Sequence, residues 1–193
     1  MKPPLSVLFA TSEAYPLVKT GGLADVSGAL PGALRDVGID CRLLLPGYTR
    51  VIEGVQAARE VARIEDIPGF GLVRILEVRM PDSGVPVYVI DYPWHYRRAG
   101  GFYQDGNGED YPDSAWRFAL LSRIAARLAG PRTPLDWHPA VLHCHDWQTG
   151  LAPAYLRFEG GGARSVMTLH NLAYQGIFAP DMVEPLGLPA ASF

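Results

Sequence analysis

Short apolar runs and a helical stripe organise the first part of the chain. Residues 5–10 and 41–45 are almost continuously apolar, which is typical of strands that a parallel sheet buries on both faces. Between them, over residues 23–37, leucine and valine recur every three or four positions and predict a helix that ends at Gly38. Pro31 lies inside this pattern, so we expect a kink or an interruption there. This order of elements predicts an α/β fold with a doubly wound, mostly parallel sheet.

The middle of the chain has shorter apolar runs. Residues 58–64, 72–78 and 85–90 form these runs, and turn-forming proline and glycine residues separate them. We expect an antiparallel insertion that then returns to the main sheet. Residues 91–111 are rich in Gly, Tyr and Asp, and a loop of this length inside a domain is usually functional or mobile.

The second half returns to alternating helices and strands. Asp113 is expected to cap a helix over residues 114–128, whose apolar positions have helical spacing. Residues 140–144 predict the next strand, a helix is expected to begin near Trp147, and residues 165–169 predict a further strand.

Composition and charge narrow the class of protein. The chain has 193 residues, enough for about one domain, and 48% of them are apolar, enough for a substantial core. Its 17 basic and 20 acidic residues give a net charge of −3, which argues against binding to the nucleic-acid backbone. Two cysteines, no apolar run long enough for a membrane span and no room for a signal peptide lead us to expect a cytoplasmic protein without membrane contact.

A glycine turn between the first strand and the first helix is the first candidate site. Gly21 and Gly22 allow a ligand to approach the backbone, and the helix N-terminus and Lys19 attract an anion. Asp25 follows in the first helical turn. The same residues also fit a plain glycine turn with a solvated lysine.

A second polar cluster ends the strand at residues 140–144. His143, His145 and Asp146 are residue types that bind metals, although a common ion would require the backbone to turn there. The alternative is that His143 is a core histidine and that Asp146 caps the helix expected near Trp147.

His170 and Asn171 form the third cluster, after the strand at residues 165–169. Imidazole and amide groups both donate and accept hydrogen bonds, which suits a ligand rich in hydroxyl groups. A polar turn is the simpler alternative. Because all three clusters follow strands of one expected sheet, a shared site at its carboxyl edge is favoured over three unrelated turns.

The three clusters, in this order, resemble the signature blocks of the bacterial glycogen synthase and plant starch synthase family. The blocks occupy residues 19–26, 145–150 and 170–176, and the resemblance extends over nearly the whole chain. It implies the N-terminal half of a two-domain GT-B glycosyltransferase with Rossmann-like domains. The implied reaction is the retaining transfer of glucose from ADP-glucose to the non-reducing end of glycogen or another α-1,4-glucan, with no metal and no other cofactor. The absence of a transit segment favours the bacterial branch.

The resemblance also implies roles for individual residues. Asp146 and His170 would be catalytic, beside the transferred glucose, where an oxygen of either residue could stabilise a developing cationic carbon. His143 and Cys144 would then be structural, with His145 beside Asp146 facing the crevice. The implied substrate-binding residues are Lys19, Gly22, Asp25, Tyr96 and Asn171. Tyr96 lies in an aromatic segment, residues 91–96, which by itself favours packing, so only the resemblance directs it to the cleft.

Nothing in residues 1–193 resembles the family's second domain, which carries the nucleotide pocket. We therefore expect this chain to be the acceptor-side catalytic domain, incomplete and inactive by itself. Two alternatives stay open. One is a stand-alone glucan-binding module without catalysis, and the other is a metal-dependent hydrolase built on His143, His145, Asp146 and His170.

Overall fold

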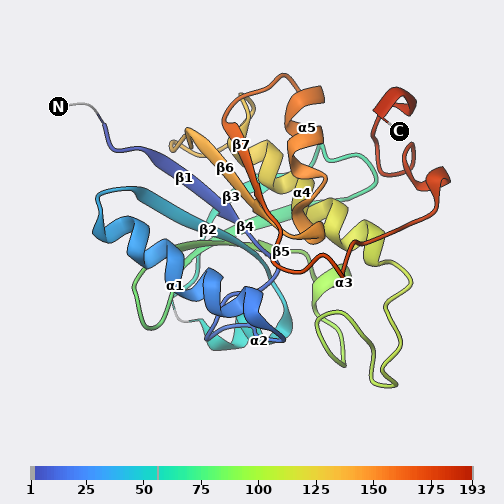
Figure 1. Ribbon diagram of the computed structural model, residues 1–193, viewed down its shortest axis with the longest axis horizontal. Coiled ribbons are helices and arrows are strands. Elements are labelled where there is room, and N and C mark those ends of the chain that lie inside the picture. The colour runs from blue at the N-terminus through green and yellow to red at the C-terminus, as the bar shows by residue number, and fades with distance from the viewer. Residues whose placement is uncertain (1–2, 56, 193) are drawn as a thin grey trace.

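The computed structural model describes residues 3–55 and 57–192, which fold around a seven-stranded sheet of order β3-β4-β5-β2-β1-β6-β7 (Figure 1). The strands are β1 (Ser6–Ala10), β2 (Asp40–Pro46), β3 (Arg59–Ile64), β4 (Val73–Arg79), β5 (Pro86–Asp91), β6 (Val141–His145) and β7 (Arg164–Thr168). The α-helices are α1 (Gly22–Asp36), α2 (Thr49–Gly54), α3 (Pro93–Tyr96), α4 (Ser114–Ala129) and α5 (Ala152–Phe158). Short 3-10 turns are η1 (Trp147–Thr149), η2 (Pro180–Met182) and η3 (Ala190–Ser192).

The sheet is parallel over most of its width. Strands β5, β2, β1, β6 and β7 run in the same direction. Strand β4 pairs antiparallel with both β5 and β3, so the β3–β4 hairpin extends the β5 edge. The expected mostly parallel α/β sheet and its antiparallel insertion are both confirmed.

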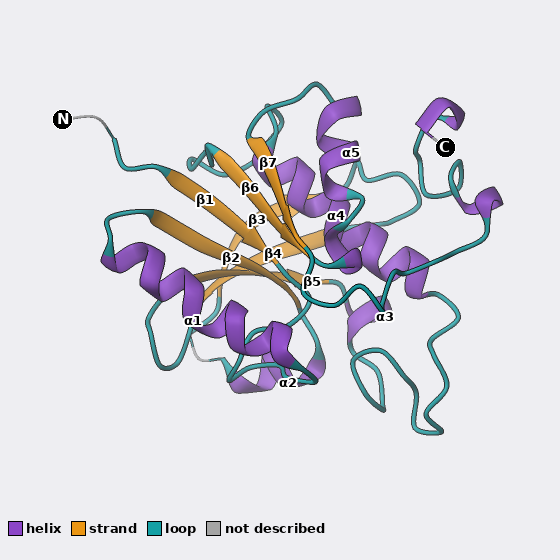
Figure 2. Cartoon of the chain, viewed as in Figure 1, coloured by secondary structure: helices purple, strands orange, loops and turns teal. Residues whose placement is uncertain are grey.

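Helices cover both faces of the sheet. Helix α1 carries the chain from β1 to β2, whereas α4 carries it from β5 back across the sheet to β6. Right-handed crossovers that run in opposite directions place their helices on opposite faces. Figure 2 shows this arrangement, with α1 and α2 on one side of the strands and α4 and α5 on the other.

Helix α1 runs without a break from Gly22 to Asp36, so the interruption expected at Pro31 is absent. Proline removes one backbone hydrogen bond from a helix. The Pro31 side chain is buried on the inner face of α1 together with Leu23 and Ala24. This packing offsets the lost hydrogen bond, because tertiary contacts supply most of the stability of a helix in a folded protein.

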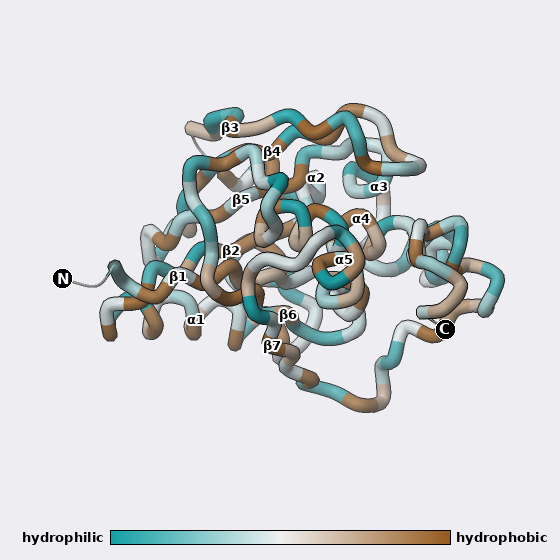
Figure 3. Tube along the Cα trace, turned by 90° about the horizontal axis from the view of Figure 1, so that it is seen from above, coloured by the Kyte–Doolittle hydropathy of each residue, from teal (hydrophilic) through white to brown (hydrophobic). Residues whose placement is uncertain are grey.

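The central strands form the core. Leu8 and Phe9 of β1, Leu44 of β2 and Val89 of β5 have no exposed surface, as expected for parallel strands covered on both faces. Figure 3 shows hydrophobic stretches along these strands. Strand β7 differs, because it lies at the sheet edge and its residue Val166 is 47% exposed. Within residues 3–55 and 57–192, no helix has the length and apolar character needed to cross a membrane.

Candidate active site

The three polar clusters lie at the carboxyl ends of β1, β6 and β7, which are neighbours in the sheet. The chain leaves β1 toward β2 on one side and leaves β6 toward β7 on the other. Such a divergence is a topological switch point, the place where open α/β sheets bind ligands. The fold therefore brings the glycine turn, Asp146 and His170 to the same edge of the sheet.

A buried carboxylate, that of Glu13, organises the glycine turn. Glu13 is 3% exposed, and its Oε2 accepts hydrogen bonds from the backbone N–H groups of Thr20 (2.5 Å) and Gly21 (3.4 Å). Its Oε1 accepts hydrogen bonds from the Thr20 hydroxyl and the Tyr103 hydroxyl, both at 2.6 Å. A buried carboxylate requires donors of this kind. Glu13 was not among the residues expected at the site, although it lies only three positions after the last residue of β1 and so near the carboxyl edge of the sheet.

The N-terminus of α1 is open to a ligand. Its N-cap, Gly21, has no side chain, and among the described residues only the Gly21 N–H is bound there, by Glu13. The N–H groups of the first helical turn therefore remain available to an anion. A Cβ atom built on Gly21 or Gly22 would meet nothing within 4 Å. Lys19 Nζ lies 2.6 Å from Asp25 Oδ1, and the two side chains are 47% and 56% exposed. A cation and a carboxylate thus stand in solvent beside the free end of the helix.

Asp146 has an unusual backbone. Its φ of 55° and ψ of −176° lie in a region that only glycine adopts easily, and an ordinary residue held there costs about 1–3 kcal/mol. The carboxylate does not cap η1. Instead, its Oδ1 accepts a hydrogen bond from the backbone N–H of His170 at 2.7 Å. Thr149 fixes the turn further, because its Oγ1 accepts from the His145 N–H (2.6 Å) and donates to the His145 carbonyl (2.9 Å).

The histidines at this edge occupy different environments. His143 Nε2 lies 2.8 Å from Thr168 Oγ1. His145 has no exposed surface, contrary to the expectation that it faces the crevice, and its ring stacks on Phe9 at 3.9 Å. Burial, together with His143 and His170 nearby, lowers the pKa of His145 to about 2, so this ring is neutral at physiological pH. In the part of the chain that the structure describes, no three His, Cys, Asp or Glu residues are placed to hold a metal ion.

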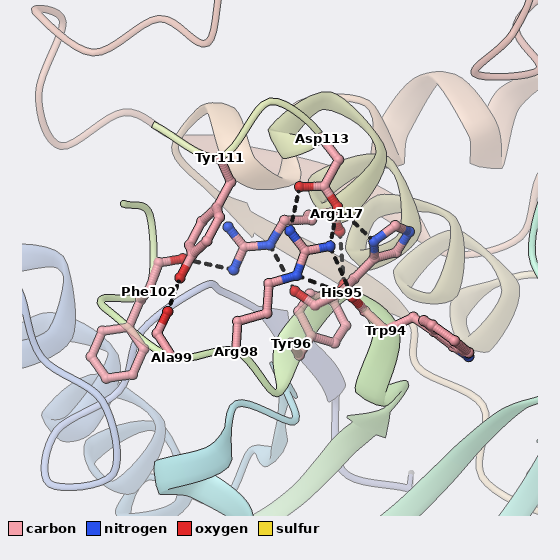
Figure 4. Close-up of polar contacts among 9 residues, drawn as sticks. All are labelled: Trp94, His95, Tyr96, Arg98, Ala99, Phe102, Tyr111, Asp113 and Arg117. Carbon is pink, nitrogen blue, oxygen red and sulfur yellow. Dashed lines mark hydrogen bonds and ion pairs between the residues drawn. The ribbon is translucent and has the colours of Figure 1, made fainter. Parts of the chain in front are cut away.

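Tyr96 lies inside the protein rather than in the cleft where we expected it. It is 2% exposed, its ring packs edge-on against Tyr48, and its hydroxyl donates to the Arg117 carbonyl at 2.7 Å. Figure 4 shows this hydroxyl directed toward α4. The neighbouring Trp94 is the exposed aromatic of α3, at 79%. Asn171 is exposed as expected, and its Oδ1 accepts from the Ala173 N–H at 2.9 Å.

Asp113 precedes α4 but does not cap it, so that expectation was wrong. Its carboxylate binds His95 Nδ1 at 2.9 Å and the Arg98 guanidinium at 2.5 Å. Buried Arg117 donates to the carbonyls of His95 and Phe102, each at 2.8 Å (Figure 4). Asp113 therefore binds charged and ring nitrogen partners instead of capping α4. Arg98 links two parts of the 93–113 segment, and Arg117 ties that segment to α4.

Comparison with known proteins decides the family. The starch synthase catalytic domain model matches residues 6–193. The chain belongs to this family. The glycogen synthase of Nitrosospira multiformis is 50% identical over 195 residues, which cover 99% of this chain and 39% of that protein. The glycogen synthase of Aromatoleum aromaticum is 54% identical, over 97% of this chain and 38% of that protein.

A solved structure supports the same assignment. The catalytic domain of starch synthase IV from Arabidopsis thaliana, bound to ADP and acarbose, superposes with a TM-score of 0.77 at 28% identity, covering 99% of this chain and 38% of that one. The chain thus spans about two fifths of the length of the curated relatives it matches. The resemblance seen in the three sequence blocks is confirmed at the level of family and fold.

Proposed function

We propose that this chain is the N-terminal, acceptor-side domain of a glycogen synthase that transfers glucose from ADP-glucose to the non-reducing end of an α-1,4-glucan with retention of configuration. The observation that carries the proposal is the strained Asp146, held at the switch point with its carboxylate bonded to the His170 backbone. Strained residues of this kind cluster at active sites, where the surrounding structure holds them in place. The matched relatives are glycogen synthases, and the solved starch synthase holds ADP.

The chemistry requires negative charge beside the anomeric carbon. In the transfer, the bond from C1 to the diphosphate oxygen breaks and a bond from C1 to the acceptor hydroxyl oxygen forms. The hydroxyl proton leaves with the diphosphate. Positive charge develops on C1 as the old bond breaks, and preorganised oxygen atoms stabilise it. Asp146 supplies a carboxylate at this position, and its hydrogen bond to His170 fixes the neighbouring main chain.

The glycine turn serves the other end of the breaking bond. The diphosphate gains charge as it leaves, and the uncapped N-terminus of α1 is suited to an anion. Lys19 adds a full positive charge there, and Gly22 leaves the approach open. We assign the nucleotide-binding domain and the rest of the diphosphate site to the part of the relatives that this chain does not cover.

A fusion protein tests the proposal. Residues 1–193 are joined to the part of the Nitrosospira multiformis glycogen synthase that the match does not cover; we call this protein the fusion enzyme. We expect it to transfer labelled glucose from ADP-glucose to glycogen, whereas the 193-residue chain alone should not. Asp146→Asn should reduce transfer at least about a hundredfold, the size of effect seen when one preorganised group is lost.

The control is Asp82→Asn, which changes an exposed carboxylate in the turn after β4 and should leave transfer unchanged. A folded fusion enzyme without transfer would refute the proposal. Glycogen binding by such an inactive protein would instead support the glucan-binding module.

A further inference from the structure

One polar side chain at the carboxyl edge has no direct access to a ligand. His145 is completely buried between the rings of Phe9 and His143, whose centroids lie 3.9 Å and 4.1 Å away. Its main chain is clamped from both sides by Thr149. Its Nδ1 lies 2.9 Å from Nε2 of His170, a hydrogen-bonding distance.

The hydrogen bond between the two rings contains one proton, and the surroundings of His145 decide which ring carries it. The other nitrogen of His145, Nε2, is buried and has no partner among the described residues. If Nε2 carried the proton, a buried N–H donor would be left unpaired, and such donors are rare in proteins. The favoured arrangement leaves Nε2 bare, so that Nδ1–H of His145 donates to Nε2 of His170.

This arrangement also fixes the tautomer of His170. Because Nε2 of His170 accepts a hydrogen bond, the proton of this ring lies on Nδ1. His170 Nδ1 makes no hydrogen bond to any residue that the structure describes, and His170 is only partly buried. The backbone of His170 is held in addition by Asp146 at 2.7 Å.

We propose that His145 is a positioning residue that holds His170 as the Nδ1–H tautomer and directs this N–H toward the bound sugar. The statement about the sugar rests on the proposed function, whereas the statement about the tautomer does not. His170 then donates a hydrogen bond from Nδ1 to a sugar hydroxyl. His145 touches no substrate and acts only through His170.

The tautomers can be measured without any activity. In the 193-residue chain labelled with ¹⁵N at histidine, two-bond nitrogen–proton correlations show which ring nitrogen carries the proton. We expect Nδ1–H for both His145 and His170 at pH 7, with the signals assigned by their loss in His145→Phe and His170→Gln. An Nε2–H tautomer or a cationic ring at His145 would overturn the proposal.

Kinetics of the fusion enzyme test the consequence. His145→Phe keeps an aromatic ring on Phe9 but removes the donor, and kcat should fall roughly five- to twentyfold, about the value of one hydrogen bond. KM for ADP-glucose should change less than about twofold, because the remaining donor-binding contacts are unaffected. His145→Asn restores an N–H near the Nδ1 position and should recover kcat to within about threefold of the parent.

His143→Phe is the matched control. His143 belongs to the same ring stack but bonds Thr168 rather than His170, so kcat should stay within about twofold of the parent. A folded His145→Phe enzyme with unchanged kcat, or a His145→Asn enzyme no better than His145→Phe, would overturn the proposal. If the parent fusion enzyme does not transfer glucose, the proposed function fails, and the tautomer measurement still decides the role of His145.

Discussion

Replacing Lys19 by alanine should impair use of the anionic donor far more than use of the glucan. The Lys19 side chain is 47% exposed, and its Nζ already bonds Asp25 at 2.6 Å. A charge-assisted hydrogen bond to a phosphate is worth about 1.5–3 kcal/mol when partly buried. Solvent screening and competition from Asp25 reduce this to about 1–2 kcal/mol. At about 1.4 kcal/mol per factor of ten, Lys19→Ala should lower kcat/KM for ADP-glucose roughly five- to thirtyfold.

The assay is steady-state kinetics of the fusion enzyme, with ADP-glucose and glycogen varied separately. The constants for glycogen should barely change, because the acceptor is neutral. Lys19→Arg should recover only part of the loss, since the guanidinium is larger and planar. Arg79→Ala provides a matched control and should leave both sets of constants unchanged. Arg79 pairs with Pro86, the first residue of β5, and so lies at the opposite end of the strands from the glycine turn. If Lys19→Ala retains normal kcat/KM for ADP-glucose, Lys19 is a solvated lysine and our interpretation of the glycine turn is wrong.

Three further predictions concern stability. Glu13→Gln should lower the free energy of unfolding by about 1–3 kcal/mol in urea titrations, because the amide N–H groups would face the groups that now donate hydrogen bonds to the carboxylate. An unchanged free energy of unfolding would show that Glu13 does not stabilise the turn. Asp146→Gly should be about 1 kcal/mol more stable than Asp146→Ala, since both lose the bond to His170 but only glycine relieves the backbone; equal stabilities would argue against strain at this position. The pKa of His145 is about 6.5 in the unfolded chain and about 2 in the folded protein. As the pH falls below about 6.5, the unfolded state takes up a proton on His145 that the folded state does not, so the free energy of unfolding declines. Between pH 7 and pH 5 the decline should be about 2 kcal/mol smaller in His145→Phe than in the parent, and identical pH dependences would contradict the neutral, buried assignment.

The order of strands and helices was predictable from the sequence because local patterns determine it. The apolar run at residues 5–10 became β1 (Ser6–Ala10), and the run at residues 72–78 became β4 (Val73–Arg79). The turn residues between the short runs correctly indicated the hairpin. The break expected at Pro31 did not occur, because packing of the helix face outweighed a local preference.

The side-chain partners at the site could not be predicted, because they come from distant parts of the chain. Tyr103 reaches Glu13 across 90 positions, and Asp113 bonds Arg98 across 15. No periodicity encodes such pairs. The sequence indicated correctly that polar residues gather at the strand ends, but it did not reveal the strained backbone of Asp146. For Tyr96, the preference of aromatic residues for packing was a better guide than the role implied by the resemblance.

Glucose transfer by the fusion enzyme tests the central claim most directly. The measurement is incorporation of labelled glucose from ADP-glucose into glycogen, with the new linkage identified by its release with an enzyme specific for α-1,4 bonds. We predict α-linked incorporation by the fusion enzyme and at least about a hundredfold less by its Asp146→Asn variant. A folded fusion enzyme that transfers no glucose, or whose Asp146→Asn variant is as active as the parent, would contradict the claim that this edge of the sheet is a glucosyl-transfer site.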